Sequence, residues 1–551
     1  MKRVPLVLIV AAVIGGVIFA IERSVRPPAT LDDLLSHVPE NAALVVAFPD
    51  LAHLDGGTLA LGAACQADFG PGFSRNLLGL LPVSDETLAR AVADRAALVV
   101  ALRPECRAPL VLVGVHGRHN LHGPDRETVR IDGNVLMASR DPAWFEGSHA
   151  AGKPGPARWP AAFAADSRTN HLLVHIDVPR WKDAIERKLF LFGSMATMAT
   201  AAQGEGSVDL IHAMTDAVRS LIGQLDSITV AGYIGGAGIR VHCAIHPRTG
   251  GPIADYLASA SRIEPPWPQI AGADSGRLLG FLGGAWRLEQ GQVSLMEVTS
   301  RLLCDATKDS ADVETAEMEK AVEVCRRIDG QFVTVLLDEK NHAQAITFVS
   351  AREPELALDG MARLTHITQT ATGRAMIENT RTTHETIAGR KATVACITMA
   401  MPDPIQQQMV KSMYGGVELC TVYLPAPGGF WTCVSTPAAS RALAEQLATG
   451  ALPPLRDDPR VREALASITP NPDGLGLMDV SQVVRFGLRL AAALNLPDVQ
   501  LPPDAGDGAT PPPFVVGGLY LRPAACEFEV RVPAAAIGDL LRIGRVAGQP
   551  Q

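Results

Sequence analysis

The sequence predicts an α+β protein in which a single N-terminal transmembrane helix precedes two similar lobes. Each lobe is expected to be a mainly antiparallel sheet with helices packed on one side. Three observations lead to this prediction: an uncharged apolar run near the N-terminus, many short segments in which apolar and polar residues alternate, and the recurrence of these segments in the same order in both halves. Such alternation is typical of strands with one buried and one wet face, as in antiparallel sheets.

Composition bounds the protein class before any motif is considered. The chain has 551 residues, of which 47% are hydrophobic and 19% charged. That is enough apolar material for a large core, and it excludes wholesale disorder. The net charge of −9 leaves no surplus of basic side chains to neutralise phosphates, so nucleic acid is not an expected partner.

The first predicted element is a membrane span at residues 4–21, which contain no charged side chain. A helix of this length rises about 27 Å at ~1.5 Å per residue, close to the thickness of the hydrocarbon core. Lys2 and Arg3 precede the run and favour a cytoplasmic N-terminus. We expect residues 1–22 to form a signal-anchor in the cytoplasmic (inner) membrane, with the body facing the periplasm or another extracytoplasmic side. A signal peptide cleaved after Ala20 and a cytoplasmic body are the alternatives.

The body is divided by its proline- and glycine-rich segments. Residues 23–30 are a short tether and residues 263–276 a linker, which leaves a first lobe at 31–262 and a second lobe at 277–551. A segment rich in acidic residues, 294–328, has helical apolar spacing and predicts a helical insertion specific to the second lobe.

The two lobes are expected to be copies because matching blocks occur in the same order. Each lobe has a strand–turn–strand block, then a strand that ends at an aspartate and leads into a helix (Asp177 and Asp479), then a hairpin followed by a helix. Chance similarity between generic α+β segments is the alternative. In the last hairpin, Cys526, Phe528 and Val530 are expected to be buried, with Glu527, Glu529 and Arg531 facing water.

The nine cysteines suggest one disulfide. The segments ELCTVYL and FWTCVST read as two strands around a PAPGG turn, and pairing Tyr423 with Phe430 places Cys420 opposite Cys433. Cross-strand cysteines can form a disulfide in an oxidising compartment. Two buried thiols are the alternative. Cys304 and Cys325 could meet in a similar way across a helical hairpin.

A resemblance to a known family rests on loosely spaced motifs. Pro39, Glu40, Leu44–Val46, Asp50 and Leu51 follow the membrane segment, and Gly429, Ser435 and Pro437 later form a glycine–strand–serine–helix pattern. Together with the strand-terminal aspartates, these features resemble an uncharacterised bacterial family of membrane-anchored proteins. The resemblance implies an extracytoplasmic body of duplicated α+β lobes. It implies no catalytic residues, because the family has no established activity.

Two groups of side chains are candidates for chemistry. His116, His119 and His122 lie in one predicted loop and could ligate a divalent metal, although a solvated loop is the simpler interpretation. His171, His175 and Asp177 share one face of a predicted strand, and a His–Asp pair is half of a nucleophilic relay. Because Asp177 stands where that strand gives way to a helix, capping the helix is its simpler role.

These observations favour a non-enzymatic protein over an enzyme. We expect a membrane-tethered binding or envelope structural protein that has no cofactor and interacts with the bilayer through residues 4–21. Its further partner is expected to be an envelope protein or a hydrophobic ligand. One alternative is a carrier that holds a lipid in a cavity between sheet and helices. Another is a metal-dependent hydrolase that uses the histidine cluster.

Overall fold

The computed structural model describes most of the chain from residue 29 onward. The described residues are 29–67, 96–115, 129–146, 169–200, 215–216, 218–259, 261–273, 276–287, 323–324, 327–364, 377–401, 403–494 and 512–547. The chain divides into two compact units. Unit 1 comprises Met1–Ala184 and Asp226–Cys243, and unit 2 comprises Ile185–Leu225 and Ala244–Gln551. The α+β class is confirmed, and the predicted lobe boundaries stay a prediction.

The predicted membrane anchor at residues 4–21 lies outside the described residues. Within the described part of the chain, no helix combines the length and the apolar character needed to cross a bilayer. The predicted insertion at 294–328 also lies almost entirely outside it.

Unit 1 is built on an antiparallel sheet with the strand order β4-β5-β3-β2-β1-β6-β7-β8. Its central strands are short runs of Leu, Val and Ala because side chains on both of their faces are buried. The strands are β1 (Leu44–Phe48), β2 (Leu98–Leu102), β3 (Leu110–Gly114), β4 (Val129–Asp132), β5 (Val135–Ala138), β6 (Leu172–Asp177), β7 (Leu225–Gly235) and β8 (Gly238–Pro247).

Helices cover this sheet on opposite faces. Helix α2 (Leu31–Ser36) buries Leu34 and Leu35 among Val45 and its neighbours, whereas α3 (Leu51–Cys65) buries Leu54 among residues of the other face, such as Val111. A capping box between Thr30 and Asp33 begins α2, because each side chain hydrogen-bonds the other residue's backbone N–H. The 3₁₀ turn η2 (Pro142–Phe145) adds the buried Trp144.

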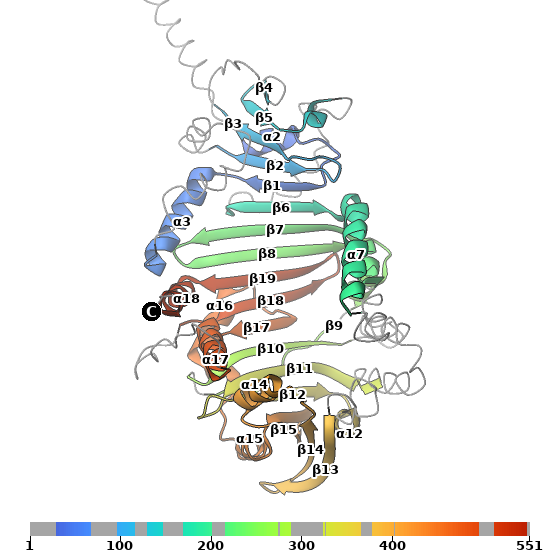
Figure 1. Cartoon of the computed structure of the whole chain (residues 1–551), viewed down its shortest axis with the longest axis vertical. Helices are drawn as coiled ribbons and strands as arrows, with labels where there is room; N and C mark the ends of the chain where they lie inside the picture. Colours follow the sequence, from blue (N-terminus) through green and yellow to red (C-terminus); the bar gives the residue numbers. More distant parts are fainter. Residues whose placement is uncertain are drawn as a thin grey trace, which may run out of the picture. The chain divides into compact units, whose positions relative to one another are not determined.

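Unit 2 is built on a longer antiparallel sheet with the order β19-β18-β17-β10-β11-β12-β16-β15-β14-β13 (Figure 1). A two-residue strand, β9 (Ser261–Arg262), pairs with the end of β10. The other strands are β10 (Leu278–Arg287), β11 (Ile328–Leu337), β12 (Ala343–Ala351), β13 (Ile377–Ile387), β14 (Arg390–Met399), β15 (Glu418–Ala426), β16 (Gly429–Ser435), β17 (Gly474–Met478), β18 (Val515–Arg522) and β19 (Ala525–Pro533).

The helices of unit 2, like those of unit 1, pack on both faces of the sheet, so the expectation of helices on one side is wrong for both units. Residues of α15 and α16 share a core with Cys396 and Cys420 of the sheet, while residues of α12 share another with Ala395 and Tyr423. Successive residues of a strand point to opposite faces, so these cores lie on different sides. The helices are α7 (Val178–Thr200, shared between the units), α9 (Pro252–Ser259), α12 (Pro354–Leu364), α14 (Pro404–Tyr414), α15 (Pro437–Thr449), η6 (Leu455–Asp457), α16 (Pro459–Ser467), α17 (Val480–Ala493) and α18 (Ala534–Ala547).

Candidate functional site

The predicted metal ligands His116, His119 and His122 lie outside the described residues. His171, His175 and Asp177 are described, at and just before strand β6. Asp177 begins helix α7: its Oδ1 accepts a hydrogen bond from the Arg180 backbone N–H at 3.3 Å, and its Oδ2 pairs with Arg180 Nε at 2.9 Å. The structure therefore gives Asp177 the capping role.

His171 is buried in a small aromatic cluster between α3 and the sheet of unit 1. Its ring lies 4.2 Å from that of His53 and 4.8 Å from that of Tyr233, measured between centroids. Burial, with a smaller contribution from His53, lowers the pKa of His171 to about 4, so the ring is neutral at pH 7. Its Nδ1 accepts from the Ile234 backbone N–H at 3.3 Å. A Cβ at Gly57 would lie 2.5 Å from this ring, so α3 can approach the sheet this closely only because residue 57 is a glycine. The cluster is therefore explained by close helix–sheet packing.

The most distinctive surface of unit 2 is one face of the strands β11, β10, β17, β18 and β19. Val333, Leu282, Gly476, Gly517 and Val530 form a row across these strands, since each lies directly opposite the next. The flanking rows are Gln331–Gly284–Gly474–Leu519–Phe528 and Val335–Gly280–Met478–Val515. We call these three rows the open face.

The open face is apolar, and several of its side chains are exposed to solvent while the others are half-buried. It contains no charged residue, and Gln331 is its one polar side chain. Leu282 is 69% exposed and Met478 47% exposed, and Phe528 and Val530 are exposed as well. An antiparallel sheet with one wet face normally presents polar residues there. A contiguous exposed apolar surface is instead typical of a binding site.

Strand β19 has the opposite orientation to the one its sequence predicts. Phe528 and Val530, expected inside, are exposed, while Glu529, expected outside, is buried. The carboxylate of Glu529 is satisfied by hydrogen bonds from the Thr469 backbone N–H at 2.8 Å and hydroxyl at 2.7 Å, and by Arg531 Nε at 3.1 Å. Buried charge is tolerated when it is paired in this way, and the apolar side of the strand is left to solvent.

Glycines make the middle of the open face shallow. Gly280, Gly284, Gly474, Gly476 and Gly517 occupy three adjacent strands, and Leu282 bends over Gly476, with its Cδ1 3.8 Å from the place a Cβ would take. A glycine weakens a strand interior and often marks a position where a ligand or another chain approaches the backbone. The face thus combines an exposed aliphatic surface with direct access to the sheet.

On the other face of unit 2, the disulfide differs from the predicted one. Cys420 is bonded to Cys396 of β14, and Cys433 is a buried free thiol, so the Cys420–Cys433 pairing is wrong. The turn of the hairpin β15–β16 is only Pro427–Gly428, where Gly428 has a φ of 71°, and Tyr423 therefore lies opposite Thr432. That two-residue change of register places Ser435, not Cys433, opposite Cys420. Cys304 and Cys325 lie outside the described residues.

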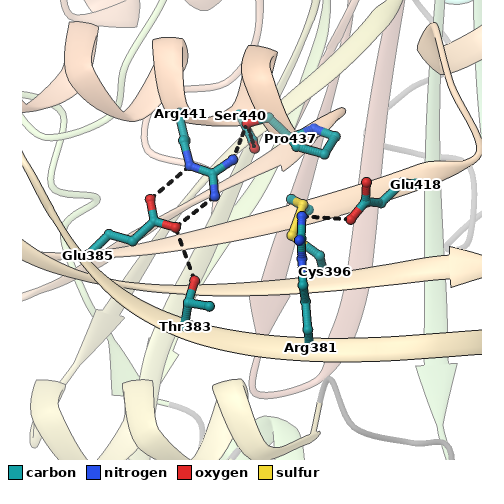
Figure 2. Close-up of a disulfide and its surroundings, with 9 residues drawn as sticks. Arg381, Thr383, Glu385, Cys396, Glu418, Pro437, Ser440 and Arg441 are labelled. Carbon is teal, nitrogen blue, oxygen red and sulfur yellow. Dashed lines mark hydrogen bonds and ion pairs between the residues drawn. A yellow bond between two sulfur atoms is a disulfide. The ribbon is translucent and has the colours of Figure 1, made fainter.

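Charged pairs surround the disulfide (Figure 2). Arg381 of β13 and Glu418 of β15 form an ion pair of 2.9 Å, and Arg441 of α15 holds both carboxylate oxygens of Glu385, at 2.7 and 2.8 Å. Cys396, Glu418 and Cys420 have ligand atoms close enough together for a metal ion, but the two sulfurs are joined to each other. The group therefore does not fit a metal in its oxidised form.

The Arg441–Glu385 pair predicts an acid-sensitive contribution to stability. The hydrogen bonds from Arg441 lower the pKa of Glu385 to about 2 from an ordinary value of 4.5. A lowered folded-state pKa stabilises the fold above pH 4.5, and that stability is lost as the pH falls towards 2. We expect Glu385→Gln to flatten the decline of the denaturant midpoint between pH 4.5 and 2. Arg441→Gln and the double variant should show the same flattened profile; additive effects would contradict this assignment.

A second ion pair, which is buried, joins the N-terminal ends of α16 and α17. Arg460 Nη1 donates to Asp479 Oδ2 at 2.9 Å, and the Gln482 backbone N–H donates to Asp479 Oδ1 at 3.0 Å. The Arg460 guanidinium lies 4.2 Å above the ring of Phe514. Asp479 thus caps α17, as its sequence position predicts, and also neutralises a buried arginine that the sequence did not reveal.

Sequence reasoning also missed the open face, although a signal for it is present. The segments LGFLGG, DGLGLM and VVGGLY each place two or three glycines among aliphatic residues in strand patterns, and Gly280, Gly284, Gly474, Gly476 and Gly517 fall on one strand face. Read together, they predict neighbouring strands that are bare on one face.

No protein-family model, no curated protein and no solved structure matches this chain.

Proposed function

We propose that this chain is a non-enzymatic binding protein, tethered to the cytoplasmic membrane and working on its extracytoplasmic side. The membrane anchor in this proposal is the uncharged run at residues 4–21. The Cys396–Cys420 disulfide supports the compartment, because disulfides persist mainly in oxidising environments. Of the groups described above, His171 packs against Gly57 although its Nε2 has no hydrogen-bond partner, and the buried Asp479 and Glu529 accept hydrogen bonds that hold the fold. These structural roles favour binding over catalysis.

The observation that carries the binding role is the open face of unit 2. The strands of the open face have aliphatic or aromatic residues at alternate positions, as a buried strand face does. Four of these residues are nevertheless exposed: Leu282, Met478, Phe528 and Val530. Leaving such side chains in water costs free energy, at about 25 cal/mol for each Å² of apolar surface. A ligand that covers the face recovers this free energy.

The chemistry of the open face favours the acyl chain of a lipid as the ligand. The backbone N–H and C=O groups of its inner strands are used in the ladders on either side. An extended peptide laid on the face would therefore bury its own amide groups without partners, which is costly. A hydrocarbon chain has no such groups, and the glycines let it lie close to the sheet.

A photoreactive fatty acid tests this proposal on the full-length protein in lipid nanodiscs. We expect diazirine-palmitate to label peptides of β10, β17 and β19, and the variant Leu282→Asp to lower that labelling at least fivefold. Leu282 is well exposed, so the change should leave the fold intact, as circular dichroism would verify. Leu59→Asp, at an exposed leucine of α3, is the matched control. Labelling spread evenly over the protein, or unchanged by Leu282→Asp, would exclude the open face as the site.

We also propose that the two units arose by duplication. The order β8-β7-β6-β1-β2-β3-β5-β4 in unit 1 is matched in unit 2 by β19-β18-β17-β10-β11-β12-β16-β15, with β14 and β13 added at the end. Chain order is preserved throughout the match. Asp177 and Asp479 follow corresponding strands and cap corresponding helices. Independent origins would not be expected to reproduce both the connectivity and the caps.

A further inference from the structure

The C-terminal half of α7 has an outward surface of unusual composition. Phe190 and Met195 are each 67% exposed, and Leu191 is also exposed. These residues share one side of the helix with Arg187, because positions three, four and eight residues apart lie on one face. Lys188 lies beside them and is exposed, as is Arg187. We call Arg187, Lys188, Phe190, Leu191 and Met195 the outer stripe.

Charged and apolar side chains are separated along the length of α7. Its charged side chains all precede residue 189, and the remainder, LFLFGSMATMAT, has none. An interfacial helix places apolar side chains between acyl chains while lysine and arginine remain at the headgroups. The uncharged part is about 18 Å long at ~1.5 Å per residue, too short to span a bilayer but long enough to lie in its surface.

We propose that the outer stripe of α7 docks onto an anionic lipid bilayer. Phe190, Leu191 and Met195 would enter the acyl region, and Arg187 and Lys188 would pair with lipid phosphates. The complementarity of charge selects this occupant: a purely apolar protein surface would leave the two cations desolvated, whereas an anionic headgroup layer neutralises them. The predicted membrane anchor at residues 4–21 would keep the helix within reach of such a bilayer. This docking is independent of the open face.

The test compares the full-length chain in nanodiscs of phosphatidylglycerol and of phosphatidylcholine. A photoreactive benzoylphenylalanine replacing Leu191 should crosslink to lipid at least fivefold more in the anionic discs. The same residue replacing Leu59 should crosslink no more than background in either disc. Adding Arg187→Glu and Lys188→Glu to the Leu191 probe should abolish the preference for phosphatidylglycerol.

Amide exchange gives a second readout that needs no crosslinker. Exchange in residues 187–195 should slow several-fold in anionic discs, and Phe190→Ser with Met195→Ser should remove this slowing. Ile405→Ser in α14, at an equally exposed residue, should not. Equal crosslinking in both discs, crosslinks to protein instead of lipid, or exchange that is unaffected by lipid charge would each overturn the proposal.

Discussion

Replacing Asp479 with alanine is expected to lower the free energy of unfolding of unit 2 by about 3–5 kcal/mol, the range found when one partner of a buried ion pair is removed. The cost is large because Arg460, which is 8% exposed, would lose its partner at 2.9 Å and keep its charge in a buried position beside the more distant Asp458, at 4.0 Å. The change also removes the side-chain acceptor for the Gln482 N–H at the start of α17. Amide exchange of β17 and β18 in the native state measures the effect within unit 2.

The chain contains a matched control for this prediction. Asp177 caps α7 and pairs with an arginine, but its partner Arg180 is on the same helix and partly exposed. Asp177→Ala should therefore cost about 1 kcal/mol, the usual price of a lost helix cap. Asp479→Asn, which keeps a cap acceptor but loses the charge, should fall between the two. If Asp479→Ala cost no more than Asp177→Ala, the Arg460 pair would contribute nothing beyond capping.

These two aspartates show which parts of the fold are accessible from sequence. Each ends a strand and starts a helix, so local chemistry alone predicts its capping role. Arg460 is nineteen residues from Asp479 and on another helix, and nothing local indicates their contact. The α+β class was predictable for the same reason as the caps. Strands and helices are recognised from apolar residues that recur every two or every three to four positions, and this pattern is local in the sequence.

The orientation of β19 was not predictable from its own alternation. The pattern Cys526, Phe528, Val530 against Glu527, Glu529, Arg531 correctly indicates a strand with two different faces. The buried face is the one that carries Glu529, whose carboxylate accepts hydrogen bonds from the backbone N–H and hydroxyl of Thr469, sixty residues earlier in the chain. An exception of this kind is expected at functional surfaces, where the rule for a stable sheet gives way to binding.

The disulfide shows how a small local error spreads. Reading PAPGG as a longer turn moves the register of β15 and β16 by two residues, and the wrong cysteine then faces Cys420. The correct partner, Cys396, lies on β14, and its pairing requires the non-local contact between β14 and β15. Sequence patterns within one hairpin contain no information on that third strand.

Reducing the Cys396–Cys420 disulfide is expected to lower the free energy of unfolding by about 3 kcal/mol. The bond joins positions 24 residues apart, and closing a loop of that size restricts the unfolded chain by roughly this amount. Denaturant unfolding with and without dithiothreitol measures the difference. The double variant Cys396→Ala/Cys420→Ala should lose the same stability and should no longer respond to the reductant.

A variant of Cys433 is the control that distinguishes the Cys396–Cys420 bond from the Cys420–Cys433 bond that the sequence predicted. Burial raises the pKa of the Cys433 thiol to about 12, so it stays protonated and is a poor nucleophile towards the neighbouring disulfide. Cys433→Ala should therefore keep the full response to dithiothreitol and lose only the packing of one sulfur atom. Peptide mapping without reduction should recover Cys396 linked to Cys420; a Cys420–Cys433 link would overturn both the register and this prediction. Finding the Cys396–Cys420 bond in protein isolated under thiol-blocking conditions would mean that the body matures in an oxidising compartment, because reducing cytoplasm does not sustain such bonds.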